Sequence, residues 1–135
     1  MVLDKGKKMS AKLKLETPFV DARGSIQALV MEPVNDVAII HSVKGSIRAN
    51  HFHKTDSHYA YLIYGKIRYL TRDVGSNAEP TAEIINPGEL FHTPKMLEHL
   101  MYFEEDSAFI NISNNNRSHS SYEEDVIRVN LDKFI

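Results

Sequence analysis

Hydrophobic residues along this chain occur in short runs and not at helical spacing. The runs are rich in β-branched and aromatic residues, which are typical of strands, and turn-forming residues separate them. Many short strands at regular intervals predict an all-β sandwich or barrel. The strands are expected at residues 25–31, 37–43, 46–53, 58–65, 66–72, 81–87, 99–105, 108–113 and 126–131.

The segments between these runs indicate loops and a single domain. Residues 73–80 are typical of a hairpin tip, and residues 113–121 are polar enough for an exposed crossing loop. At 135 residues the chain is long enough for one compact domain and too short for two ordinary ones. We therefore expect a polar, lysine-rich N-terminal segment at 1–16 and one domain at 17–135.

Charge and composition argue against several classes of protein. The net charge is −2 with neutral histidines, whereas nucleic-acid-binding proteins usually carry a basic excess, so no nucleic-acid partner is expected. No apolar run approaches the roughly 20 residues of a membrane-spanning helix, so no membrane partner is expected either. The chain has no cysteine, and its N-terminal residues lack the apolar stretch of a secretory signal. These features favour a cytoplasmic protein.

Three of the seven histidines lie close together in the middle of the chain. His51 and His53 are two positions apart on one predicted strand and therefore share a face. His58 begins the next strand, so a hairpin would bring its ring close to the other two. Three imidazoles that point to one place can hold a divalent transition metal ion, and they can equally transfer protons or bind a substrate. The residues alone leave these alternatives open.

A fourth histidine, His99, opens a later strand after a proline-led turn. It would complete a set of four nitrogen ligands for Zn, Fe, Ni, Mn or Cu. No organic cofactor is expected. His41, His92 and His119 lack comparable spacing, and we expect structural or surface roles for them.

The spacing of these residues resembles the two motifs of the cupin superfamily. The residues that match the first motif are Gly45, His51, His53, His58 and Gly65. Cupins usually have glutamate at the position of His58. The second motif runs from Pro94 to His99, with Met96 in place of its glycine. The resemblance implies an all-β double-stranded β-helix jelly roll (cupin) with a metal site of His51, His53, His58 and His99.

Three further stretches narrow this resemblance. They are Asp-x-Arg-Gly at 21–24, Arg-x-x-His-x-His-Lys at 48–54 and Tyr-Glu-x-Asp-x-x-Arg at 122–128. Together they resemble small cupins of nucleotide-sugar and polysaccharide biosynthesis. That group includes dTDP-4-keto-sugar 3,4-ketoisomerases, relatives of dTDP-4-dehydrorhamnose 3,5-epimerase and the C-terminal cupin of capsular polysaccharide enzymes. The resemblance covers nearly the whole chain from residue 19 onward.

The narrower resemblance also implies roles for individual residues. His51 matches the catalytic base of the isomerases and epimerases, and His53 matches the second active-site histidine of the isomerases. Arg23 and Arg48 match arginines near the nucleotide phosphates. Tyr122 is a candidate acid or substrate contact.

The chain departs from that group at three points. Ala49 replaces the glycine that usually follows the arginine of the first motif. His58 stands where the isomerases commonly have glutamine, and those enzymes act without metal. Strand alternation places Arg48 on the face opposite His51, so Arg48 is expected to reach the cavity only through a bulge or from a neighbouring subunit.

Three functions follow from these patterns. The one we favour is a nucleotide-sugar isomerase or epimerase that moves a proton on a dTDP- or UDP-linked keto-sugar, with or without a bound divalent metal. The alternatives are a metal-dependent cupin oxygenase and a non-catalytic sugar-binding cupin. Tyr59 and Tyr61 share the strand face opposite His58, and an aromatic outer face indicates packing against another subunit, so a homodimer is expected.

Overall fold

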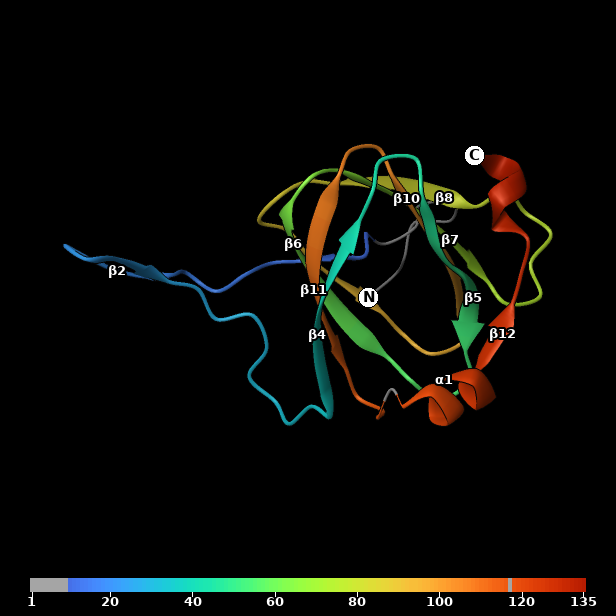
Figure 1. Ribbon diagram of the computed structural model, residues 1–135, viewed down its shortest axis with the longest axis horizontal. Coiled ribbons are helices and arrows are strands. Elements are labelled where there is room, and N and C mark those ends of the chain that lie inside the picture. The colour runs from blue at the N-terminus through green and yellow to red at the C-terminus, as the bar shows by residue number, and fades with distance from the viewer. Residues whose placement is uncertain (1–9, 117) are drawn as a thin grey trace, which may run out of the picture.

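Two antiparallel sheets of five strands face each other and form the body of the protein (Figure 1). This computed structural model describes residues 10–116 and 118–135. Within those residues, no helix has the length and apolar character needed to cross a bilayer. The elements are β1 (Lys12–Leu13), β2 (Phe19–Asp21), β3 (Gly24–Ile26), β4 (Asp36–Ser42), β5 (Ile47–His53), β6 (His58–Tyr64), β7 (Ile67–Asp73), β8 (Thr81–Ile85), β9 (Leu90–Thr93), β10 (Leu97–Phe103), β11 (Ser107–Ser113), α1 (His119–Asp125), β12 (Val126–Arg128) and the 3₁₀ helix η1 (Leu131–Phe134).

The order of the strands is that of a jelly roll. One sheet has the order β1-β9-β6-β11-β4 and the other has the order β12-β5-β10-β7-β8. From β4 to β12 the chain crosses to the other sheet at every step except the step from β7 to β8. The predicted all-β jelly roll is therefore confirmed.

Side chains between the sheets change from apolar to polar along each central strand. On β11 the inward residues run from Phe109 to Asn111 and Ser113, and on β10 they run from Phe103 to His99. The apolar end contains a cluster of buried aromatic and aliphatic residues. Full burial of each large apolar side chain contributes roughly 1.5–3 kcal/mol. One half of the sandwich therefore stabilises the fold, and the other half is left for polar chemistry.

Several elements differ from the pattern expected from the sequence. The strand predicted at 126–131 ends at Arg128, and β2 and η1 were not predicted. The strand predicted at 25–31 is wrong beyond Ile26, since the chain there leaves β3 and Gln27 donates a hydrogen bond to the Glu16 carbonyl. Part of the expected polar N-terminal segment forms β1, which pairs with β9. The run that forms β9 has four residues and was not predicted. The helix α1 begins inside the loop predicted at 113–121. It was not predicted because its sequence shows no apolar periodicity.

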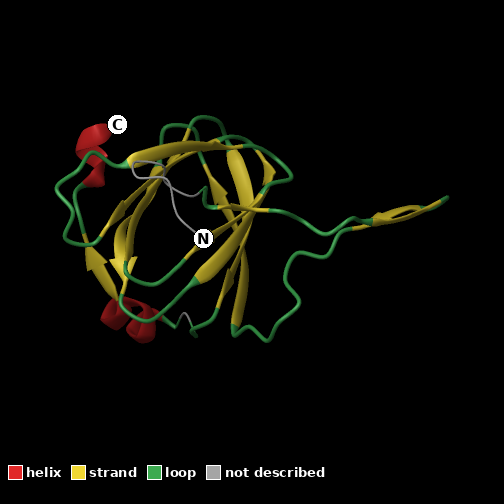
Figure 2. Cartoon of the chain, turned by 180° about the vertical axis from the view of Figure 1, so that it is seen from behind, coloured by secondary structure: helices red, strands yellow, loops and turns green. Residues whose placement is uncertain are grey.

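The hairpin of β2 and β3 projects away from the two sheets (Figures 1 and 2). Its apolar side chains are exposed, with exposed fractions of 60% for Phe19, 68% for Val20 and 69% for Ile26. A two-stranded hairpin without a packing partner is marginally stable in water. The hairpin therefore has the character of an element that packs against another surface.

Candidate functional site

The four predicted histidines meet inside the polar half of the sandwich. His51 and His53 lie on β5, His58 begins β6 and His99 lies on β10, and all four are buried. The ring centroids of His51 and His99 are 4.9 Å apart, and those of His53 and His58 are 5.5 Å apart. Imidazoles from both motifs therefore converge, although His58 of the first motif and His99 of the second are 41 positions apart in the sequence.

A bulge in β5 brings Arg48 into the same cavity. On β10, His99 pairs with His51 and the next residue pairs with Ala49, so one residue of β5, Asn50, is left over. Ala49 and Asn50 have φ values of 68° and 61°, which are in the left-handed region. Because one extra residue reverses the alternation of a strand, Arg48 points to the side of His51 and lines the cavity.

Both residues that replace a motif glycine keep the backbone conformation that favours glycine. Ala49 has a φ of 68° and Met96 has a φ of 61°. The N–H of Met96 donates to the carbonyl of His53 at 2.8 Å, which ties the turn before β10 to the end of β5. At both positions the backbone therefore has a conformation that glycine adopts more readily than other residues.

We expect Met96→Gly to raise the free energy of unfolding by about 0.5–1 kcal/mol. A left-handed conformation costs a non-glycine residue roughly 1–2 kcal/mol, and the extra freedom of glycine in the unfolded chain offsets part of that gain. Urea denaturation measures the difference. Met96→Ala, which removes the side chain but keeps the strain, should stay near wild type, and Ala82→Gly on β8 should be destabilised. A Met96→Gly variant less stable than Met96→Ala would contradict this reading.

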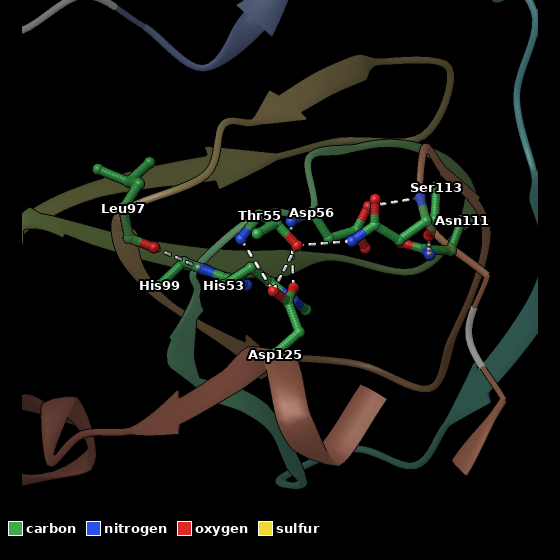
Figure 3. Close-up of polar contacts among 9 residues, drawn as sticks. His53, Thr55, Asp56, Leu97, His99, Asn111, Ser113 and Asp125 are labelled. Atoms are coloured by element: carbon green, nitrogen blue, oxygen red, sulfur yellow. Dashed lines mark hydrogen bonds and ion pairs between the residues drawn. The ribbon is translucent and has the colours of Figure 1, made fainter. Parts of the chain in front are cut away.

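Asp125, at the end of α1, is the centre of a hydrogen-bond network around His53 (Figure 3). Its carboxylate accepts a bond from Nδ1 of His53 at 3.1 Å. It also accepts bonds from the backbone N–H and the hydroxyl of Thr55, at 2.8 and 2.6 Å, and from the N–H of Asp56 at 3.1 Å. The network fastens the turn between β5 and β6 to α1 and fixes the orientation of the His53 ring.

Two opposing effects act on the pKa of Asp125. Burial raises the pKa, but hydrogen bonds from Thr55, Asp56 and His53 together outweigh burial, so the pKa of this carboxyl lies below its ordinary value of 3.8. Asp125 is therefore ionised at neutral pH. An ionised carboxylate can only accept a hydrogen bond, so the neutral His53 imidazole that bonds to it carries its N–H on Nδ1.

The donor set of these residues fits a divalent transition metal ion. The nitrogens of His51, His53 and His99 lie within 4.8 Å of one another, and so do the donor atoms of His53, Asp56 and His58. Nδ1 of His99 donates to the carbonyl of Leu97 at 2.9 Å. Because Nδ1 of His53 and of His99 each have a partner outside the cavity, Nε2 is the nitrogen with which either ring can coordinate an ion. Imidazole ligands suit Zn, Fe, Ni and Cu.

His51, His58 and His99 line a cavity of about 360 Å³, within the roughly 300–1,000 Å³ range of small-molecule sites. Arg48 spans the space between the sheets, since its Nε donates to Oγ of Ser42 at 2.7 Å and its terminal nitrogen donates to the His41 carbonyl at 3.0 Å. Tyr122 reaches the cavity from α1, with its ring centroid 5.9 Å from that of His51. The lining residues are Ile40, Ile47, Arg48, Ala49, His51, His58, His99, Met101, Phe109, Asn111, Tyr122 and Arg128.

Arg23 is the one predicted site residue that the structure does not bring to the cavity of its own chain. It lies at the turn of the projecting hairpin, where its side chain is 86% exposed. Its guanidinium pairs with the carboxylate of Asp21 at 2.6 Å and lowers the pKa of that group. Arg23 therefore does not line the cavity formed by His51, His58 and His99.

Several cavity residues were missed by the sequence analysis. Asn111 is a polar residue on the inward face of a strand. Strand alternation predicts a side chain of the hydrophobic core at this position. Arg128 is the last residue of the closing motif and lines the cavity from β12. Asp125 belongs to the same motif. Alternation and the quoted motif were the signals that could have identified them.

Comparisons with solved structures support the fold in detail. The sugar 3,4-ketoisomerase QdtA from Thermoanaerobacterium thermosaccharolyticum, in complex with TDP, is 17% identical, with a TM-score of 0.70 over 91% of this chain and 92% of that chain. The RmlC epimerase of Mycobacterium tuberculosis is 14% identical, with a TM-score of 0.69 over 87% of this chain and 66% of that one. CapF, a capsular polysaccharide assembling protein from Staphylococcus aureus, is 21% identical, with a TM-score of 0.62 over 86% of this chain and 34% of CapF.

The chain thus shares the jelly-roll fold of the QdtA ketoisomerase and the RmlC epimerase. The predicted resemblance to these small cupins is confirmed at the level of the fold. No protein-family model matches the chain, and no curated protein sequence matches it.

Proposed function

We propose that the protein is a nucleotide-sugar isomerase or epimerase that moves a proton beside the carbonyl of a dTDP- or UDP-linked keto-sugar. The observation that carries this proposal is the buried cluster of imidazoles in a cavity that also contains two arginines. A mutant of the QdtA ketoisomerase has been solved in complex with TDP-4-keto-6-deoxyglucose, which supports a ligand of this class for a cavity of this fold. We place the protein in nucleotide-sugar or polysaccharide biosynthesis on the same grounds.

Proton transfer beside a carbonyl needs a base with a pKa near neutrality. In this proposal His51 takes the proton from the carbon next to the carbonyl, and the electron pair moves to the carbonyl oxygen to give an enediolate. The carbonyl moves when the proton returns to the former carbonyl carbon and the hydroxyl proton of the adjacent carbon passes to the former carbonyl oxygen. Return of the proton to the opposite face of the carbon that lost it inverts that centre. Tyr122, whose ring lies 5.9 Å from His51 and 6.0 Å from His53, is placed to exchange a proton from another direction.

The nucleotide diphosphate needs cationic partners at the cavity. Arg48 and Arg128 both line it, and an arginine can donate two parallel hydrogen bonds to phosphate oxygens. Arg128 is exposed and only loosely paired with Glu123, at 3.3 Å, so a phosphate can compete for it. Arg48 lines the cavity while its guanidinium also donates hydrogen bonds to Ser42 and His41 of β4.

Incubation with dTDP-4-keto-6-deoxyglucose in D₂O tests the proposal. Proton NMR should show loss of the signal of the hydrogen beside the carbonyl, because a base that removes this proton exchanges it with solvent. UDP-linked 4-keto-sugars are tested in parallel. A wild-type protein that incorporates no deuterium into any of these sugars would remove the basis of the proposal.

The four histidines favour a second candidate, a metal-dependent cupin oxygenase. His51, His53, His58 and His99 would hold the ion, which would supply Lewis-acid or redox chemistry when bound. Elemental analysis of protein purified without added metal separates the candidates. Stoichiometric Fe, Ni or Cu that is lost in His58→Ala favours the oxygenase, whereas full deuterium exchange by metal-free protein favours the isomerase. A non-catalytic sugar-binding cupin would bind the sugar nucleotide and exchange no hydrogen.

We further propose a homodimer in which the hairpin of β2 and β3 packs on a second copy. Phe19 and Val20 are largely exposed on the hairpin, and Ile39 (62% exposed) and Val43 (70% exposed) are exposed on or just after β4, the edge strand of one sheet. Light scattering should find a dimer for the wild type and a monomer for Val20→Asp, because a buried unpaired charge disrupts an apolar interface. Val74→Asp, at an exposed turn, is the control and should remain dimeric. A dimer that survives Val20→Asp would contradict this arrangement.

A further inference from the structure

Asn111 is a buried amide in the wall of the cavity that faces the β5 and β10 histidines. It lies on β11, in the sheet opposite β5 and β10, and its side chain lines the cavity with an exposed fraction of 4%. Its inward neighbour on the same strand is Phe109. A buried amide without hydrogen-bond partners lowers the stability of the fold by roughly 1–3 kcal/mol. An amide in place of an apolar core residue therefore indicates a role in ligand binding or catalysis.

Small side chains on both sides leave room beside this amide. In the sheet, Asn111 pairs with Ala38 on β4 and with Ala60 on β6. Each alanine occupies little of the space between the sheets at that level. The volume in front of Asn111 therefore belongs to the cavity and not to the packed core.

The amide is held in one orientation by Ser113. Nδ2 of Asn111 donates to Oγ of Ser113 at 2.9 Å, and Ser113 is fully buried (Figure 3). This bond uses one of the two N–H groups of the amide. The other N–H and the amide oxygen have no hydrogen-bond partner among the described residues, and they adjoin the cavity.

We propose that Asn111 donates its second N–H to the carbonyl oxygen of the substrate and stabilises the enediolate. This inference rests on the proposed function. When the C–H bond breaks, the proton goes to His51, the electron pair forms the carbon–carbon double bond, and the carbonyl oxygen takes the negative charge. A fixed N–H beside that oxygen binds it more strongly as the charge grows, and this difference accelerates the reaction. The base and the oxygen-binding group then act on the sugar from opposite sheets.

Variants of Asn111 test the inference in the deuterium-exchange assay. Asn111→Leu keeps the approximate volume and removes the donor, and we expect kcat to fall about 10²–10³-fold. Asn111→Asp has the shape of the wild-type residue but places negative charge beside the developing oxyanion, so it should be at least as slow. The affinity for dTDP alone, measured by calorimetry, should stay at the wild-type value, which also shows that the variants fold. Asn77→Leu, in an exposed loop, is the control and should retain full activity.

The outcomes separate this inference from the proposed function. Normal exchange by the wild type and by both Asn111 variants overturns the role of Asn111 and leaves the proposed function intact. Exchange by the wild type that is lost in Asn111→Leu and Asn111→Asp, with dTDP affinity unchanged, supports the role. A wild type that exchanges no keto-sugar overturns both.

Discussion

Replacement of His51 by asparagine should lower the rate of deuterium incorporation by about 10²–10⁴-fold, the usual contribution of a positioned general base. The asparagine amide has nearly the same reach as the imidazole but takes up no proton at neutral pH. The affinity for dTDP should change little, because the diphosphate is expected at Arg48 and Arg128. NMR and calorimetry measure the two quantities.

His41→Asn provides a matched control for this experiment. His41 is exposed on β4, where Nδ1 lies 3.3 Å from the hydroxyl of Tyr64, and it does not line the cavity. Its replacement should leave the exchange rate unchanged. If His51→Asn exchanges hydrogen as fast as His41→Asn, then His51 is not the base.

Asp125→Ala should lower the free energy of unfolding by about 3 kcal/mol, because it leaves two buried and two partly buried donors without their acceptor. The donors are Nδ1 of His53, the N–H and hydroxyl of Thr55 and the N–H of Asp56. Asp125→Asn retains one oxygen and should lose less. Glu124→Ala, at an exposed neighbour on the same helix, should remain near wild type in urea denaturation.

The effect of Asp125 should depend on pH with a definite sign. Because the folded-state pKa of this carboxyl is lowered, its stabilising contribution is fully present above the ordinary value of 3.8 and is lost as the pH falls through the folded-state pKa. The difference in stability between wild type and Asp125→Asn should therefore shrink at a pH below 3.8. A difference that stays constant across this range would mean that the charge of Asp125 does not stabilise the network.

Much of the fold and of the site could be predicted because strand alternation and motif spacing are local properties. The alternation of His51 with His53, and the position of His58 at the start of β6, predicted that the three rings share the interior, and the structure places them there. Its place at the start of a later strand made His99 a candidate fourth ligand, but no local pattern contains its pairing with His51 across β10 and β5. The resemblance implied that the two motifs meet.

Other features depended on the three-dimensional arrangement and were not readable from alternation. Arg48 reaches the cavity because Asn50 is an extra residue in β5, and a bulge is set by pairing with the neighbouring strand. Alternation marks Asn111 as an inward polar residue, but it does not show whether the wall around that residue is packed or borders a cavity. The direction of the hairpin that carries Arg23 is decided by what it packs against, which sequence periodicity does not describe.

The most direct test of the account is a crystal structure of His51→Asn with dTDP-4-keto-6-deoxyglucose. The account predicts the sugar ring between β5 and β11, with the carbon beside its carbonyl about 3–3.5 Å from the side chain at position 51 and the diphosphate at Arg48 and Arg128. A sugar nucleotide bound elsewhere, or one whose carbonyl faces away from position 51 and Asn111, would contradict it.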